Sequence, residues 1–107
     1  MSAWIGVDLD GTLASLIPIS EYTGNPDQIG KPVPLMIERV RKWLVQGREV
    51  GIFTARAENP MRIAPIEEWL IANGLPELAI INVKDSNMIE LWDDRCYRIE
   101  TNTGKVI

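Results

Sequence analysis

Short apolar runs alternate along the chain with longer segments in which apolar positions recur every three or four residues. The short runs predict buried strands, and the segments with the helical period predict amphipathic helices. The predicted strands span residues 3–9, 48–56, 78–83 and 88–92, the second of them ending near Thr54. The predicted helices span residues 33–46 and 60–73. Strands that alternate with helices favour an α/β fold with a mostly parallel sheet and right-handed crossovers.

Two segments lie outside this alternation. Residues 14–32 contain Pro, Gly, Asn and Ser throughout and predict a long loop, which in so small a domain is usually functional. Residues 96–107 predict a C-terminal β-hairpin, with Asn102 to Gly104 in its turn.

The composition is that of a soluble globular protein, and the length of 107 residues predicts a single domain over residues 1–107. The net charge of -4 argues against a broad nucleic-acid-binding surface. The lone Cys96 gives no disulfide framework and favours a reducing compartment. A signal-peptide pattern is lacking, and no apolar stretch approaches the ~20 residues needed to span a bilayer. We therefore expect a cytoplasmic protein that does not enter a membrane.

Polar side chains gather at the carboxyl ends of the predicted strands. They are Asp8 and Asp10 after the first strand, Thr54 after the second, Lys84 after the third, and Asp93 and Asp94 after the fourth. Ligands of open parallel sheets bind beyond the carboxyl ends of the strands. The sequence therefore predicts a functional site at this edge.

The residue types at this edge suit the chemistry of phosphate. Four neighbouring carboxylates repel one another unless a hard cation joins them, and Mg²⁺ binds carboxylates, backbone carbonyls and phosphate oxygens. Thr54 offers a hydroxyl and Lys84 a positive charge, while Gly11 allows a close backbone approach and Thr12 adds an N–H. A carboxylate nucleophile among such groups is typical of phosphoryl transfer.

Four short motifs, "DLDGTL", "FTAR", "VKD" and "WDD", occur in this order and each follows a predicted strand. Together they resemble motifs one to four of the haloacid dehalogenase (HAD) superfamily, over the chain from the first strand through Asp94. The resemblance implies a Rossmann-like three-layer sandwich and a magnesium-dependent phosphohydrolase.

The resemblance also implies a role for each motif residue. Asp8 would attack phosphorus and form an aspartyl-phosphate, while Asp10 would protonate the leaving oxygen and then deprotonate water. Thr54 and Lys84 would hold the phosphoryl oxygens. Magnesium would lie between Asp8, the backbone carbonyl of Asp10 and one acid of the pair Asp93 and Asp94. We favour Asp94 as the inner ligand with Asp93 in support, and the choice between them stays open.

Two departures from the family pattern bear on access to the site. The stretch between Lys84 and Asp93 is too short for the helix that the family usually has there. The chain also has no room for a cap domain, so residues 14–32 can form only a flap. The site should be open or closed by a neighbouring subunit, which allows a homo-oligomer. Arg56 follows Thr54 closely and is a candidate substrate contact, although a surface role is as plausible.

These inferences favour a capless, magnesium-dependent phosphomonoester hydrolase. Its substrate would be a small molecule or the phosphorylated end of a polymer, and a nucleic acid would bind only as such a substrate. The physiological substrate stays open. One alternative is a receiver-like domain that accepts a phosphoryl group without enzymatic turnover, although receivers do not place the acceptor aspartate beside a second acid on strand one. Another is a catalytically inactive binding protein of the HAD fold.

Overall fold

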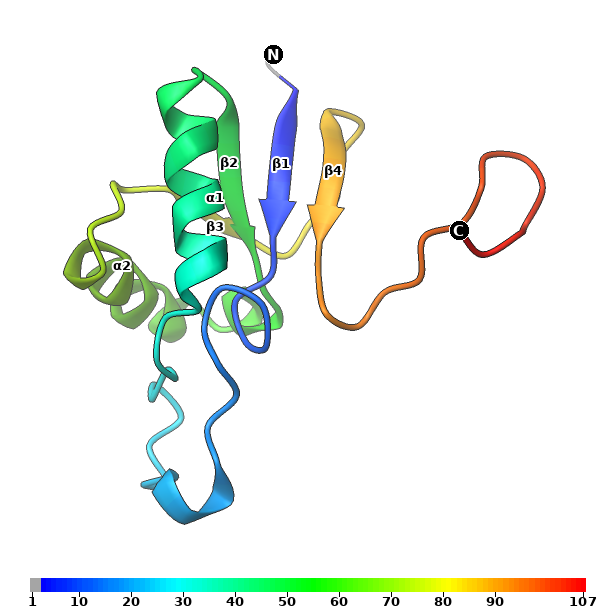
Figure 1. Ribbon diagram of the computed structural model, residues 1–107. Coiled ribbons are helices and arrows are strands. Elements are labelled where there is room, and N and C mark those ends of the chain that lie inside the picture. Colours follow the sequence, from blue (N-terminus) through cyan, green and yellow to red (C-terminus); the bar gives the residue numbers. More distant parts are fainter. Residues whose placement is uncertain (1–2) are drawn as a thin grey trace.

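The computed structural model describes residues 3–107 and contains four strands and two α-helices (Figure 1). In chain order they are β1 (Trp4–Val7), α1 (Pro34–Val45), β2 (Glu49–Phe53), α2 (Ile63–Ala72), β3 (Ala79–Ile81) and β4 (Met88–Trp92). Each predicted strand of the alternating pattern and both predicted helices are therefore confirmed, although most are shorter than predicted. Within this part of the chain, the helices lack the length and apolar character that crossing a membrane requires.

The four strands form one sheet in the order β3-β2-β1-β4, and all neighbouring pairs are parallel. The predicted α/β class and parallel sheet are thus confirmed. Val7 at the end of β1 pairs with Ile52 of β2 on one side and with Trp92 of β4 on the other. The carboxyl ends of the strands consequently meet at one edge of the sheet, the lower edge in Figure 1.

Both helices pack on one face of the sheet. Alternate strand residues such as Ile5, Val7, Val50 and Ile52 point to this face and share a buried cluster with α1 and α2. The helix residues in that cluster are Met36, Ile37, Val40 and Trp43 from α1 and Ile66 and Leu70 from α2. Burial of these apolar side chains is the main force that holds the helices on the sheet.

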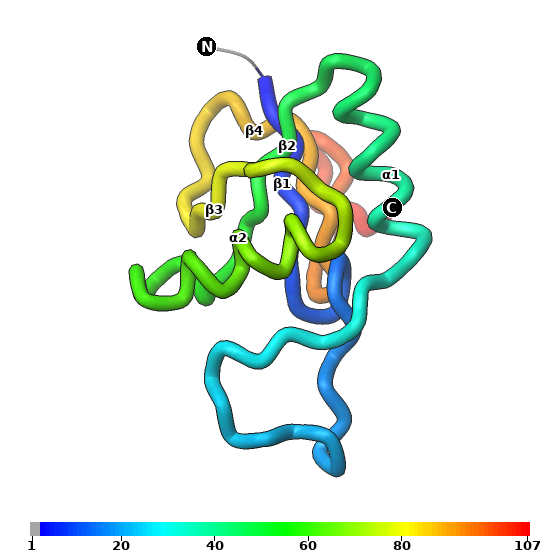
Figure 2. The backbone as a smooth tube through the Cα atoms, turned by 90° about the vertical axis from the view of Figure 1, so that its left-hand side faces the viewer, coloured from blue at the N-terminus to red at the C-terminus, as the bar shows by residue number. Residues whose placement is uncertain are grey.

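The opposite face, which we call the open sheet face, carries Trp4, Gly6, Gly51, Ala79, Ile81, Met88 and Leu91, as the strand register requires. Trp4 lies against Gly51, and Met88 lies against Gly6. Within residues 3–107, no helix packs on the open sheet face. Both helices lie on the face of Ile5 and Val7, and Figure 2 shows α1 to one side of the strands. The expected three-layer sandwich is therefore present only in part, because the connection from β3 to β4, residues 82–87, is too short to hold a helix.

Residues 14–32 form the predicted loop, whose one regular element is the short 3-10 helix Ile19–Glu21. The loop projects from the body of the molecule (Figure 1) and is called the flap below. Its base is closed where the Ser15 N–H donates to the Lys31 carbonyl at 2.7 Å. Gly30 is required beside this contact, because a Cβ atom there would overlap the Ser15 carbonyl.

The C-terminal segment reverses direction as predicted, but no β-strand follows β4 in the described chain. Asn102 and Gly104 have positive φ angles of 68° and 76°, as a tight turn requires. The Glu100 N–H donates to the Lys105 carbonyl at 2.7 Å, and the antiparallel pairing is limited to one isolated bridge. The predicted β-hairpin is therefore wrong as a pair of strands. The reason is that residues 96–107 are all exposed, and an unpacked two-stranded ribbon is marginal in water.

Candidate active site

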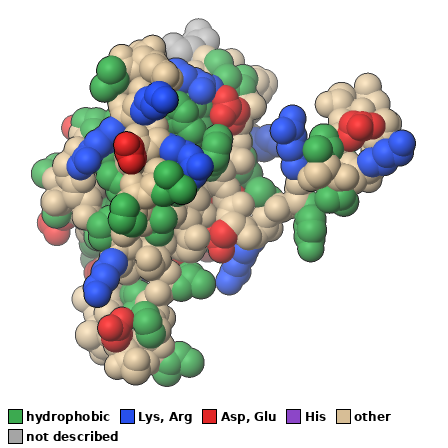
Figure 3. All heavy atoms as spheres, in the orientation of Figure 1, with side chains coloured by type: hydrophobic (Ala, Val, Ile, Leu, Met, Phe, Trp, Pro, Cys, Tyr) green, Lys and Arg blue, Asp and Glu red, His purple; other side chains and the backbone are tan. Residues whose placement is uncertain are grey.

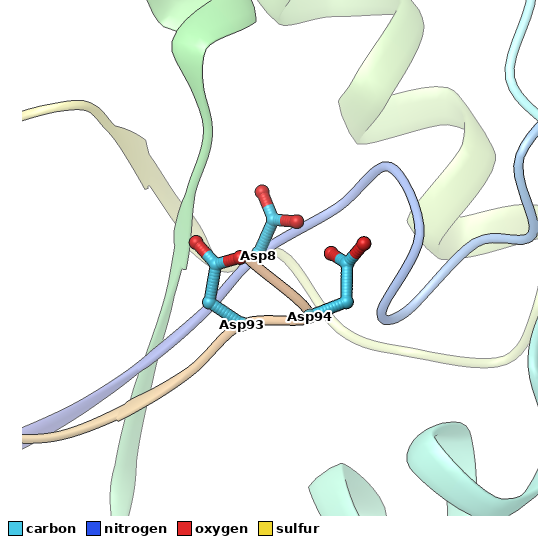
Figure 4. A group of neighbouring side chains, drawn as sticks. All are labelled: Asp8, Asp93 and Asp94. Atoms are coloured by element: carbon cyan, nitrogen blue, oxygen red, sulfur yellow. The ribbon is translucent and has the colours of Figure 1, made fainter. Parts of the chain in front are cut away.

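Three carboxylates converge at the carboxyl edge of the sheet. Asp8 follows β1, and Asp93 and Asp94 follow its neighbour β4. The Asp8 N–H donates to the carbonyl of Trp92 at 2.9 Å, which fixes the two chain segments side by side. One oxygen of each carboxylate lies within 4.8 Å of the other two (Figure 4). Asp8 and the distant pair Asp93 and Asp94 thus form a single acidic group.

The turn after β1 supports this acidic group. The Thr12 hydroxyl lies 3.0 Å from Oδ1 of Asp94 and 3.4 Å from Oδ2 of Asp8, and it accepts a hydrogen bond of 3.0 Å from the Asp94 N–H. Gly11 has a φ of 91°, and a Cβ atom there would lie 2.5 Å from Oδ2 of Asp94. A side chain at position 11 would therefore strain the backbone at this positive φ and displace the Asp94 carboxylate.

The convergence of these carboxylates changes their affinity for protons. Burial first, then the charge of Asp93 and the neighbouring Asp94, raises the pKa of Asp8 to about 7. The hydrogen bond from Thr12 is the largest cause that lowers the pKa of Asp94. Near neutral pH the half-buried Asp8 is thus partly protonated and partly ionised, first because it is buried and then because negative charge lies beside it.

The donor set fits a hard divalent cation. Asp8, Asp93 and Asp94 offer only carboxylate oxygens, which Mg²⁺ prefers over soft ligands, and their mutual repulsion is relieved by positive charge. The residues that would hold the ion are these three. The carboxylate of Asp10 does not belong to the group of three and has a different partner.

Asp10 is bound by Arg56. The guanidinium donates from Nε to Oδ2 and from Nη2 to Oδ1, both at 2.8 Å. It also donates to the flap carbonyls of Gln28 at 2.9 Å and Pro26 at 3.3 Å. Arg56 therefore links Asp10 to the flap, and the two bonds to Asp10 have the bidentate geometry that strengthens Arg–carboxylate pairs.

Thr54 lies directly after β2 and is only 3% exposed. Its N–H donates to the carbonyl of Ile81, the last residue of β3, at 2.9 Å. Its hydroxyl oxygen accepts the Arg56 N–H at 3.2 Å and caps the short 3-10 helix Ala55–Glu58. The hydroxyl proton is not used in this cap, so it is available to a bound oxygen.

A cleft of about 570 Å³ brings several of these groups together. Of the residues predicted from the sequence, Asp8, Asp10, Thr54, Arg56 and Asp93 line it. Gly11 and Thr12 in the turn after β1, and Asp94 after β4, are not among the residues that line the cleft, but they contact one another beside the acidic group.

Lys84 is not brought into the cleft lining. β3 ends at Ile81, so Lys84 lies three residues beyond the strand and is exposed. The residue at the strand end is Asn82, which lines the cleft together with Arg95. The sequence reasoning missed both of these residues. The sequence would have indicated Asn82 as a site residue if the third strand had been predicted to end with the β-branched pair Ile80 and Ile81, as it does in the structure.

Comparison of the chain with protein-family models, with curated proteins and with solved structures finds no match.

Proposed function

We propose that this chain is a capless, magnesium-dependent phosphomonoester hydrolase of the HAD type. The observation that carries the proposal is the position of Asp8, which lies against Asp93 and Asp94 and faces the same cleft as Asp10 and Arg56. A carboxylate among cation-binding acids, with a second acid and a guanidinium beside it, suits attack on a phosphoryl group.

The proposed reaction has two steps. In the first, an Asp8 oxygen forms a bond to phosphorus, the ester P–O bond breaks, and the leaving oxygen takes a proton from Asp10. In the second, a water oxygen attacks phosphorus, Asp10 takes a proton from that water, and the bond between phosphorus and Asp8 breaks. Phosphate is released and both aspartates return to their starting forms.

Asp8 acts as a nucleophile only when ionised, and its pKa of about 7 leaves it partly protonated at neutral pH. Bound Mg²⁺ would supply positive charge that neutralises the carboxylates and the phosphoryl oxygens. Asp8, Asp93 and Asp94 are the residues that would hold it.

The bidentate contact with Arg56 adds a condition to the role of Asp10. Both carboxylate oxygens accept hydrogen bonds from the guanidinium, so neither carries a proton in this arrangement. At least one oxygen must be released and take up a proton from water before Asp10 can give that proton to a leaving group. A phosphoryl group is a natural competitor for the same guanidinium.

The phosphoryl oxygens would be bound by groups that line the cleft. Thr54 has a free hydroxyl proton, and Arg56 and Arg95 supply positive charge there. Lys84 remains a candidate, but its place outside the lining makes the two arginines the stronger ones. The absence of a cap suits substrates that range from small phosphomonoesters to the phosphorylated end of a polymer.

Turnover of p-nitrophenyl phosphate with and without Mg²⁺ tests the proposal directly. We expect magnesium-dependent hydrolysis by the natural chain and a loss of several orders of magnitude in Asp8→Asn, which removes the attacking charge. Asp27→Asn is the matched control, because Asp27 is an acid of the flap that contacts Arg62 and lies outside the acidic group. Hydrolysis that persists in a clean Asp8→Asn preparation would contradict the mechanism.

Labelling of Asp8 by a small phosphodonor, measured beside turnover, separates the alternative functions. A receiver-like phospho-acceptor would be labelled on Asp8 by a small phosphodonor, once per chain, without continued turnover. An inactive binding protein would show neither labelling nor turnover. Continued turnover together with transient labelling of Asp8 fits only the hydrolase.

A further inference from the structure

The last residues of the chain, 96–107, form an arm that stands away from the body of the molecule (Figures 1 and 3). Its large apolar side chains face solvent: Tyr97 is 83% exposed, Ile99 51%, Val106 64% and Ile107 65%. The arm is held in shape by its own backbone hydrogen bonds, such as that from the Ile107 N–H to the Arg98 carbonyl at 2.8 Å. Exposed apolar side chains that cluster on an ordered segment are typical of an interaction surface.

Within residues 3–107, no helix covers the open sheet face, on which Trp4 is only 7% exposed while Ala79 is exposed and Ile81 is half-buried. This face contains a hollow of about 390 Å³, whose floor includes Trp4, Gly51, Ala79 and Ile81. Gly51 matters here because its missing side chain gives the Trp4 ring room to lie flat on the sheet. In an α/β protein with covered faces, helices would bury such a surface.

Charged side chains of opposite sign lie on the two surfaces. The charged residues of the described chain that line the hollow are Glu49, Glu77 and Asp85, and all three are acidic. The arm carries two cations, Arg98 and Lys105, against one carboxylate, Glu100. Arg98 and Lys105 are thus the two side chains of the arm that can pair with the acidic rim of the hollow.

We propose that the chain forms a symmetric dimer in which the arm of each copy packs on the open sheet face of the other. Each copy provides one arm and one hollow, so a two-fold axis satisfies both pairs of surfaces at once. The apolar side chains of the arm cover the hollow, and Arg98 and Lys105 lie near its acidic rim.

Sedimentation equilibrium of the full chain measures the assembly without reference to any enzymatic activity. We expect a species of twice the chain mass of 12.0 kDa, with dissociation on dilution. The double variant Tyr97→Ser with Ile99→Ser should be monomeric under the same conditions and should melt at the same temperature as dissociated natural chain, because both side chains are exposed within one copy. Ile71→Ser is the control, since Ile71 is 64% exposed on α2 and outside both surfaces. It should dimerise like the natural chain.

Charge reversal tests which surfaces meet. One variant reverses the arm (Arg98→Glu with Lys105→Glu), and the other reverses the rim (Glu49→Lys with Glu77→Lys). Each alone should dimerise at least tenfold more weakly than the natural chain, because like charges then face each other. An equimolar mixture of the two should restore the dimer, since both arm–hollow pairs again have opposite charges.

Three results would overturn the proposal. The first is a natural chain that stays monomeric up to about 100 µM, a concentration at which even modest interfaces associate. The second is a dimer that the Tyr97 and Ile99 substitutions leave intact. The third is a mixture of the two charge-reversed variants that remains as weakly associated as each variant alone.

Discussion

Arg56 holds the carboxylate of Asp10 by two hydrogen bonds, from Nε to Oδ2 and from Nη2 to Oδ1, each 2.8 Å long. The same guanidinium reaches the backbone carbonyls of Pro26 and Gln28 in the flap. One side chain therefore sets the position of the second aspartate of the "DLDGTL" motif and anchors the loop that borders the cleft.

Arg56→Ala should release both Asp10 and the flap. We expect kcat/KM for p-nitrophenyl phosphate to fall about 100-fold, because Asp10 loses its fixed position and the phosphoryl group loses a cation. Limited proteolysis within residues 14–32 should accelerate in the same variant. Arg62→Ala is the matched control, since Arg62 also contacts the flap, through Asp27 at 2.8 Å, but not Asp10. It should loosen the flap and leave most of the activity. Equal losses of activity in the two variants would show that Arg56 acts only by holding the flap.

The sequence predicts the fold well where strands are buried and parallel. Their apolar runs are short and uninterrupted, so β1, β2 and β4 and the two helices are recognisable without a structure. The end of β3 is not recognisable, because the apolar Val83 after Asn82 makes the strand look longer than the segment Ala79–Ile81 that the sheet pairs. The prediction of a C-terminal β-hairpin is wrong for a different reason. Apolar and polar residues alternate in this segment as in a strand, but residues 96–107 are all exposed and pack on no other part of the described chain.

The candidate site is predictable to the extent that it depends on the backbone. Asp8, Asp93 and Asp94 are found because parallel pairing of β1 and β4 dictates that the residues after them meet. The contact between Arg56 and Asp10 depends on side-chain directions across 46 positions of sequence, which no periodicity encodes. The role of Gly11 in accommodating Asp94 is likewise visible only in three dimensions.

Asp8 makes the stability of the metal-free protein depend on pH. Its pKa is raised from 3.8 to about 7 in the folded chain, first by burial and then by the charge of Asp93. Between these values the folded state binds more protons than the unfolded state, so the free energy of unfolding falls as pH rises. The stability that the protonated Asp8 gives to the folded chain is present in full below about pH 4 and is lost above about pH 7. Asp8→Asn removes this dependence, and its melting temperature should exceed that of the natural chain at pH 8 by more than at pH 5.

The measurement is thermal unfolding in EDTA at both pH values. Because other carboxylates titrate in the same range, the difference between the natural chain and Asp8→Asn at each pH is the quantity to compare. A difference for Asp8→Asn that is the same at pH 5 and pH 8 would show that the folded chain does not raise the pKa of Asp8.

Gly11→Ala tests the close approach of Asp94 to the turn after β1. Gly11 has a φ of 91°, and its added Cβ would lie 2.5 Å from Oδ2 of Asp94. Gly24→Ala is an unusually close control, because Gly24 has a φ of 86° and no described atom lies within 4 Å of its added Cβ. Both variants carry the strain of positive φ, about 1–2 kcal/mol, but only Gly11→Ala also displaces Asp94. We expect Gly11→Ala to unfold at a lower urea concentration than Gly24→Ala and to lose magnesium binding, which Gly24→Ala should retain. Equal effects of the two substitutions would mean that Asp94 moves aside without cost.

Magnesium should stabilise the folded chain through the acidic group itself. Folding brings Asp8, Asp93 and Asp94 within 4.8 Å, whereas unfolding separates them, so the ion binds the folded state far more tightly. Free metal at 100 times its dissociation constant would then add about 2.7 kcal/mol to the free energy of unfolding. For a chain of this length, that corresponds to a rise in melting temperature of roughly 10 °C or more.

Ionic screening also relieves repulsion among carboxylates, so the control is sodium chloride at the same ionic strength. The magnesium-specific rise is the difference between the two salts. Asp94→Asn should reduce that difference because a ligand is lost, and Asp27→Asn should leave it unchanged because Asp27 lies in the flap, paired with Arg62. Equal melting curves in magnesium and in matched sodium chloride would mean that the three aspartates form an acidic group that binds no divalent cation. The hydrolase would then lack the cation on which its proposed chemistry depends, whatever its activity toward aryl phosphates.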